Sequence, residues 1–294
     1  SRRAIARRWA AWLVWPLIKA LIVRAPWVGK QIHSVDERIR INRFWCVPAF
    51  WNMPDADYLV TLQCYLIPHL LSLPSSKGEI IGSIRLDDVA GMHDDDPMVS
   101  AWLAWCAYIE RRLNVRLFAL SHKVRDAARS LGVLIDHVIY NGVNTEEFTD
   151  GGRRGDVDPL RITLFYSHHP QKGKPFGCEV IRRLRAARSA KRLIFGAVGA
   201  AVSPEDWELF DVRYGYLTGD SYARMYRETD IFIFPSLYEG LGAPPLESMA
   251  SGCALVTTSI QGLERYGVHG QNCLIAAPKD VDAMVEHVTR LIHD

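Results

Sequence analysis

Two glutamates flank a turn rich in glycine and proline in the stretch LYEGLGAPPLESMASG, residues 237–252. The run DIFIFPS before it is apolar enough to be a strand buried on both faces. Ligands of open α/β sheets bind beyond the carboxyl ends of such strands. Pro244 and Pro245 suit the first turn of a helix. Glu239 is therefore expected directly after a strand, and Glu247 about one turn inside a helix.

The turn between these glutamates predicts a binding site for a diphosphate. The backbone amides of Gly240, Leu241 and Gly242 would point toward a helix N-terminus, where N–H groups and the helix dipole favour an anion. Glu247 is then suited to accept hydrogen bonds from ribose hydroxyls, and Glu239 would face the sugar beyond the phosphate. The alternative is an ordinary loop glutamate followed by a solvated glutamate at a helix start.

An acidic stretch nearer the start of the chain has the composition of a metal site. LDDVAGMHDDDP holds six residues that can bind divalent cations: Asp87, Asp88, His93, Asp94, Asp95 and Asp96. An Asp-x-Asp triplet would suit a transferase in which a divalent cation holds the diphosphate. The alternative, a solvated acidic loop in which Asp94–Asp96 cap the helix after Pro97, is the simpler interpretation. We therefore expect no metal and no other cofactor.

Strands and helices alternate on both sides of a polar segment, TDGGRRGDVDP at residues 149–159. This alternation predicts parallel sheets, and the segment between them has the composition of a linker. The predicted strands are 56–63, 78–84, 116–121, 137–142, 160–167, 191–198, 231–236 and 253–259. The predicted helices are 64–74 (a helix or turn), 95–114, 122–132, 178–190, 220–230, 245–252 and 281–294, with a loop at 168–177. We expect one domain at residues 1–150 and a second at residues 160–294, with a cleft between them.

Composition and charge limit the class of protein. The net charge of +2 over 294 residues is too small to indicate nucleic acid as a general partner. The cysteines lie far apart, without a CxxC pair or zinc-ligand spacing, which is typical of reduced thiols in a cytosolic protein. They are Cys46, Cys64, Cys106, Cys178, Cys253 and Cys273.

The chain begins with a basic, Trp-rich segment at residues 1–30, which has four arginines in its first eight positions. The apolar run at residues 9–23 is interrupted by Pro16 and Lys19 and is too short to predict a transmembrane span. Tryptophans among arginines and lysines are typical of an amphipathic helix at a membrane surface. A helix packed on its own domain explains the segment equally well. We expect a cytoplasmic protein and leave contact with the inner face of the membrane open.

Two stretches resemble the family 4 retaining glycosyltransferases of GT-B fold. They are TDIFIFPSLYEGLGAPPLESMASGCALVTT at residues 229–258 and VIYNGVNTEEF at residues 138–148, and the likeness extends over roughly residues 55–290. The resemblance implies an α/β protein with two Rossmann-like domains whose parallel sheets face each other across a cleft. It also implies that Glu239 contacts the transferred sugar, Glu247 contacts the ribose, and the loop amides between them hold the diphosphate.

The same resemblance assigns a role to the first loop of the second domain. Family members carry the pattern G-R-x-x-x-x-K-G there, and this chain has YSHHPQKG. Lys172 matches the lysine, whose charge would neutralise a β-phosphate leaving group. Without the family context, Lys172 would be an ordinary surface lysine in a turn. Ser167 departs from the arginine, which His168, His169 or Lys174 would have to replace.

Other matches to the family are more distant. The segment VRYGYLTGDSYARMYRETD resembles the one whose loop cups the base, which makes Tyr216 and Leu217 candidates for the base site. Ser121 matches a serine at a strand end, with its hydroxyl toward the cleft. Arg85 stands where relatives often place a histidine. It could stabilise charge on the phosphate or on a charged acceptor, and an ion pair with Asp87 or Asp88 is the alternative.

The expected activity is the transfer of a sugar from a nucleoside diphosphate to a glycan or lipid-linked acceptor, with retention of configuration, in synthesis of surface polysaccharide or glycolipid. Lys172, Glu239 and Arg85 are the expected catalytic residues. One alternative is a non-catalytic nucleotide-sugar binder or partner subunit, because Ser167 departs from the family and we find no opening strand with a Gly-rich loop. The other is a metal-dependent transferase built on Asp94–Asp96, which EDTA would inactivate.

Overall fold

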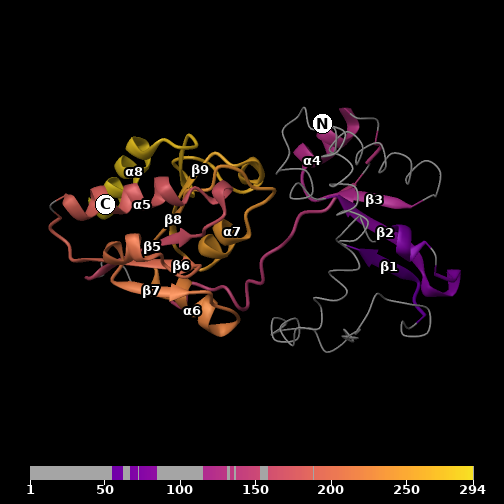
Figure 1. Ribbon diagram of the computed structural model, residues 1–294, viewed down its shortest axis with the longest axis horizontal. Coiled ribbons are helices and arrows are strands. Elements are labelled where there is room, and N and C mark those ends of the chain that lie inside the picture. Colours follow the sequence, from indigo (N-terminus) through magenta and orange to yellow (C-terminus); the bar gives the residue numbers. More distant parts are fainter. Residues whose placement is uncertain are drawn as a thin grey trace, which may run out of the picture. The chain divides into compact units, whose positions relative to one another are not determined.

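The computed structural model describes residues 55–61, 67–71, 73–84, 115–130, 133–135, 137–152, 158–187 and 189–293 (Figure 1). The predictions for residues 1–54, Arg85, the acidic stretch 87–96 and the helix 95–114 lie outside these residues. Within them, no helix is both long and apolar enough to cross a membrane.

The larger sheet has six strands, all parallel to their neighbours, in the order β10-β9-β8-β5-β6-β7. This is the strand order of dinucleotide-binding folds, in which the direction of winding reverses between the first and fourth strands of the sheet. Here these are β5 and β8. The strands are β5 (Leu160–Tyr166), β6 (Leu193–Gly199), β7 (Val212–Gly215), β8 (Ile231–Phe234), β9 (Ala254–Thr258) and β10 (Leu274–Ala276).

Both faces of this sheet are covered, as the apolar strand sequences predict. In β8, Ile231 and Ile233 belong to a core shared with helices α5 (Lys174–Ala186) and α8 (Val281–His293). Phe232 and Phe234 point to the other face. They join a core built with α6 (Asp220–Glu228) and, at its margin, α7 (Ala243–Ala250). Each fully buried side chain of this size stabilises the fold by roughly 1.5–3 kcal/mol, so β8 is held from both sides.

The connection after β5 differs from the predicted loop at residues 168–177. It forms a single 3₁₀ turn, η4 (Pro170–Lys172), and α5 then begins at Lys174. A glycine and a proline here favoured a loop in the sequence, but Pro175 lies in the first turn of α5, where its missing N–H leaves no intrahelical bond unmade. Lys172 is therefore held in a short turn between a strand and a helix.

The smaller sheet has the strand order β1-β2-β3-β4, and β3 and β4 are parallel. The predicted strand 137–142 is limited to the two residues of β4. The elements are β1 (Tyr58–Thr61), α2 (Ile67–Leu70), η2 (Ser75–Lys77), β2 (Glu79–Ile84), β3 (Arg116–Ala119), α4 (His122–Ser130) and β4 (His137–Val138).

Candidate functional site

The site is built where two neighbouring strands of the larger sheet, β5 and β8, end. Their connections to α5 and α7 leave the same edge of the sheet, since the strands are parallel. Ligands of open α/β sheets bind at such a reversal point, beyond the carboxyl ends of the strands. The connection after β5 carries Lys172, and the connection after β8 carries Glu239.

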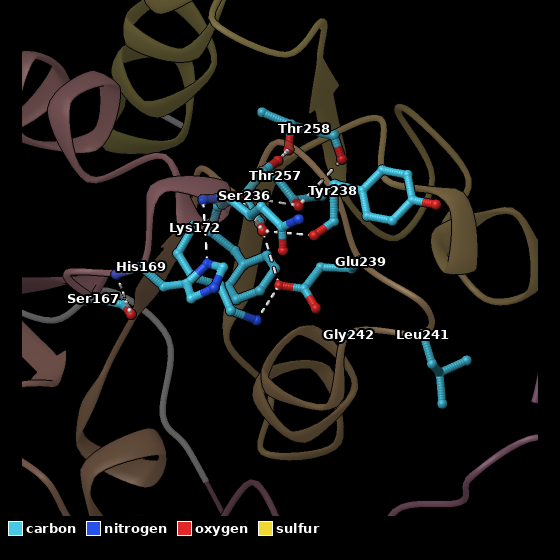
Figure 2. A network of polar contacts seen from close by, with 12 residues as sticks. Ser167, His169, Lys172, Ser236, Tyr238, Glu239, Leu241, Gly242, Thr257 and Thr258 are labelled. Carbon is cyan, nitrogen blue, oxygen red and sulfur yellow. Dashed lines mark hydrogen bonds and ion pairs between the residues drawn. The ribbon is translucent and has the colours of Figure 1, made fainter. Parts of the chain in front are cut away.

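Lys172 and Glu239 form an ion pair at this edge (Figure 2). The distance from Lys172 Nζ to Glu239 Oε1 is 2.5 Å. The Glu239 side chain is 10% exposed and that of Lys172 is 29% exposed, so the pair is partly open to solvent. Ser236 Oγ lies 2.8 Å from the same carboxylate oxygen and donates to it, because a charged acceptor is the strongest partner for its single proton.

The two connections are also joined through the backbone. The carbonyl oxygen of Gln171 accepts the Leu237 N–H at 2.7 Å, directly beside the Lys172–Glu239 pair. Behind it, the Thr258 hydroxyl donates to the carbonyl of Ser236, and Thr257 Oγ1 donates to that of Phe234 at 3.1 Å. These bonds fix the position of the β8–α7 connection relative to β9 and to η4.

Gly173 allows the closest approach between the connections. Its φ of +68° lies in the left-handed region, and a Cβ there would lie 1.9 Å from the carbonyl oxygen of Pro235. Both observations require glycine, because an L side chain strains this backbone and has no space.

Gly173→Ala is expected to lower the free energy of unfolding by about 3 kcal/mol or more, since strain at positive φ and a clash with backbone add. The matched control is Gly270→Ala, which has a φ of +76° and open space around the added Cβ. The control should lose only the left-handed penalty of about 1–2 kcal/mol. Urea denaturation of both variants measures the difference, and equal losses would contradict the close approach.

The glycine-rich turn leads into α7 with fewer N–H donors than a helix start usually has. Gly242 is the N-cap with a φ of +80°, and Pro244 and Pro245 follow inside the first turn. Two of the groups that could bind an anion are therefore missing. The Tyr266 hydroxyl donates to the carbonyl of Leu241 at 2.8 Å. Because C=O and the next N–H are antiparallel in a trans peptide, the Gly242 N–H points away from Tyr266.

Glu247 lies in a separate polar group, against α6. Tyr226 Oη is 3.2 Å from Glu247 Oε2, and Tyr222 Oη is 2.8 Å from Tyr226 Oη. Burial raises the pKa of Glu247 above its ordinary value, and hydrogen bonds from the two tyrosines oppose this shift. The two glutamates of the turn therefore have different partners, one a lysine and the other a pair of tyrosines.

The basic residues near the Ser167 position have their own partners. Lys174 Nζ lies 2.9 Å from Asp206 Oδ2, and this hydrogen bond raises the pKa of Lys174. His168 Nε2 lies 2.9 Å from the carbonyl oxygen of Ala201. Lys174 is therefore already neutralised by a buried carboxylate, which weighs against it as a substitute for the family's arginine.

The remaining predicted residues are spread over several elements. Tyr216 and Leu217 follow β7 at the same edge of the sheet. The Tyr216 side chain is 66% exposed, and Leu217 packs on the core of the α6 face. Ser121 is buried before α4, where its hydroxyl accepts the Val124 N–H at 3.2 Å, as a helix N-cap does. Arg85 lies outside the described residues.

A comparison of the sequence with family models decides what this part of the chain is. Residues 161–294 match the model described as "Glycosyl transferases group 1". The second half of the chain is a group 1 glycosyltransferase domain. It contains the larger sheet with Lys172, Glu239 and Glu247.

Curated relatives of this glycosyltransferase domain agree with the match. An uncharacterized glycosyltransferase of Methanocaldococcus jannaschii is 25% identical over 246 residues, which cover 78% of this chain and 61% of the relative. An O-antigen chain mannosyltransferase B of Escherichia coli is 36% identical over 84 residues, which cover 28% of this chain and 22% of the relative. The chain thus spans only part of the length of these relatives.

The solved structures give the fold class. A protein of Anabaena, HepE, solved in complex with UDP and glucose, matches 81% of this chain and 69% of its own. The TM-score is 0.61 at 16% sequence identity. The neighbours have the GT-B fold, so the predicted fold class is confirmed.

Several residues of the glycosyltransferase domain's site were not singled out by the sequence. Ser236 stood within the quoted glutamate motif, but nothing in the pattern distinguished its hydroxyl from that of other serines. Tyr222 and Tyr226 are four positions apart on a predicted helix, a spacing that places them on one face and could have indicated the pair. Gly173 was visible only as part of a loop.

Proposed function

We propose that this protein is a retaining glycosyltransferase that moves a sugar from a nucleoside-diphosphate sugar to a glycan or lipid-linked acceptor. The observation that carries the proposal is the Lys172–Glu239 pair at the reversal point of a dinucleotide-type sheet. A cation beside a carboxylate is what a site needs when a negative diphosphate leaves and a sugar carbon becomes positive. The group 1 glycosyltransferase domain and its sugar-transferring relatives support the assignment.

In the proposed reaction, the bond between the anomeric carbon and the diphosphate oxygen breaks, an acceptor hydroxyl oxygen bonds to that carbon on the same face, and the hydroxyl proton passes to the departing diphosphate. Lys172 stabilises the charge that grows on the departing phosphate. The N–H groups of the turn at residues 240–242 assist it. Lys172 carries more of this stabilisation than in a site with a complete helix N-terminus, because Pro244 and Pro245 remove two donors.

The two glutamates bind the parts of the donor on either side of the diphosphate. We assign Glu239 to the sugar, where its carboxylate orients the ring and balances positive charge, and Glu247 to the ribose hydroxyls. No protein nucleophile is needed for this reaction. No metal is needed either, since Lys172 and the backbone amides take its place.

The proposed acceptor and location are supported by the named relatives and by the composition of residues 1–30. A relative named as an O-antigen chain mannosyltransferase supports a role in surface polysaccharide synthesis, and the Anabaena structure with UDP and glucose supports a nucleotide-sugar donor. The basic, Trp-rich residues 1–30 support a cytoplasmic enzyme at the inner face of the membrane, with a lipid-linked acceptor.

Calorimetric titration with UDP, GDP and ADP, each with and without EDTA, tests the proposal. One nucleotide is expected to bind regardless of EDTA, and Glu247→Ala should weaken it about tenfold or more, as expected for lost hydrogen bonds to a charged group. Binding that disappears with EDTA would indicate the metal-dependent alternative. Binding of none of the three would overturn the proposed donor site.

A further inference from the structure

A chain of three polar side chains connects α6 to the first turns of α7. Tyr222 and Tyr226 lie one turn apart on α6, with 2.8 Å between their hydroxyl oxygens, and Tyr226 Oη lies 3.2 Å from Glu247 Oε2. An ionised carboxylate can only accept hydrogen bonds. Tyr226 must therefore donate to Glu247, and its own oxygen is left to accept the proton of Tyr222. The ionised state of Glu247 fixes the direction of the whole chain.

The ring of Tyr226 is anchored independently of its hydroxyl. The side chain is 0% exposed, and its ring centroid lies 4.9 Å from that of Tyr222, 5.1 Å from that of Phe232 and 5.9 Å from that of Phe148. These edge contacts between aromatic rings stabilise the packing without any hydrogen bond. Phenylalanine at position 226 would keep the packing and remove only the hydroxyl.

The surroundings of Glu247 make the two hydroxyls necessary. Burial raises the pKa of Glu247, the hydrogen bond from Tyr226 and the neighbouring Tyr222 hydroxyl lower it, and the Glu147 carboxylate raises it. Without a donor from Tyr226, the carboxyl group would take up a proton closer to neutral pH. A protonated carboxyl is a poorer acceptor for a pair of ribose hydroxyls, since one of its oxygens has become a donor.

We propose that Tyr226, supported by Tyr222, is a positioning residue that holds the Glu247 carboxylate as a hydrogen-bond acceptor for the ribose of the donor. This inference rests on the proposed function, because it takes Glu247 as the ribose ligand. It assigns to a buried tyrosine outside the glutamate motif a specific part in nucleotide recognition. Tyr226 itself touches the carboxylate, not the reacting atoms.

The pH dependence has a definite sign. Ribose binding through Glu247 is complete above the pKa of this group and is lost as the pH falls through it. Tyr226→Phe removes a hydrogen bond that lowers that pKa, so the loss is expected to begin at a higher pH than in the wild type. Glu247→Gln, which cannot ionise, should bind weakly at every pH.

The experiment measures the binding of UDP, GDP and ADP, and of analogues that lack both ribose hydroxyls, over a pH series that spans the titration of the Glu247 carboxyl group. The wild type should prefer the ribonucleotide about tenfold or more. Tyr226→Phe should bind the analogue as the wild type does, but should lose its preference for the ribonucleotide at a higher pH than the wild type, with recovery as the pH rises further. Tyr214→Phe, at a half-buried tyrosine of β7, is the matched control and should behave as the wild type.

The possible results separate the inference from the proposed function. If the wild type binds and discriminates, while Tyr226→Phe keeps both its ribose preference and its pH profile, the inference is overturned and the proposed function stands. Equal weakening for the ribonucleotide and the analogue would indicate a general packing role and would also overturn it. If no nucleotide binds to the wild type, the proposed function fails, and the inference fails with it.

Discussion

Lys172→Ala is expected to reduce sugar transfer about 10²–10³-fold, as the loss of one preorganised group at a developing negative charge does. The ammonium group is the charged donor of the β5–α5 connection that reaches the Glu239 carboxylate, and Pro244 and Pro245 limit what the start of α7 can contribute. The effect should fall mainly on kcat, because the charge on the leaving phosphate grows in the transition state.

A steady-state transfer assay with sugar conjugates of the nucleotide identified by titration measures this effect. Lys279→Ala is the matched control, since Lys279 is exposed and its removal changes the net charge by the same amount. Thermal unfolding of both variants shows whether the fold is intact. Full activity of Lys172→Ala would contradict the central role that the proposed site gives to Lys172.

Glu239→Gln is expected to slow sugar transfer and, at the same time, to strengthen binding of the nucleoside diphosphate product. Transfer should fall by about 10² or more, because the amide keeps the size of the side chain but cannot balance positive charge on the sugar. The nucleoside diphosphate should bind about 3–10-fold more tightly, because Lys172 no longer has a competing carboxylate at 2.5 Å. Ser236 can still donate to the amide oxygen, so the local structure should persist.

The two effects need two measurements on the same protein preparation, a transfer assay and calorimetric titration with the nucleotide that binds the wild type. Glu286→Gln, which removes an exposed carboxylate from α8, controls for the change in net charge. Weaker diphosphate binding in Glu239→Gln would contradict the idea that the carboxylate competes for Lys172. Undiminished transfer would contradict its assignment to the sugar.

The long, strongly apolar strands of the larger sheet were predictable because burial on both faces requires a continuous run of apolar residues. DIFIFPS became β8 nearly as predicted. Two strands that the sequence did not predict lack such a run. β7 has the sequence VRYG and lies at the edge of the sheet, and β10 has only three residues. The start of α5 was missed because Gly173 and Pro175 usually signal a loop, whereas here they form the N-cap and the first turn.

The sequence identified individual residues of the candidate site, but it did not predict how they are arranged in space. Lys172 and Glu239 were both identified, yet their ion pair joins residues 67 positions apart and depends on β5 and β8 being neighbours. Local patterns do not determine strand order. The hydroxyls of Ser236 and Tyr226 were missed for a related reason, since their importance comes from a carboxylate brought to them by the fold.

The adjacency of β5 and β8 also has a consequence for the chain as it leaves the ribosome. Between these strands the chain forms two further strands, β6 and β7, which extend the sheet in the other direction. Lys172 is therefore synthesised well before the carboxylate that it will pair with. Until β8 has been added beside β5, a nascent chain contains half of the pair and no complete donor site. The proposed donor site can thus capture nucleotide-sugar only after the central long-range strand pairing of its domain is in place.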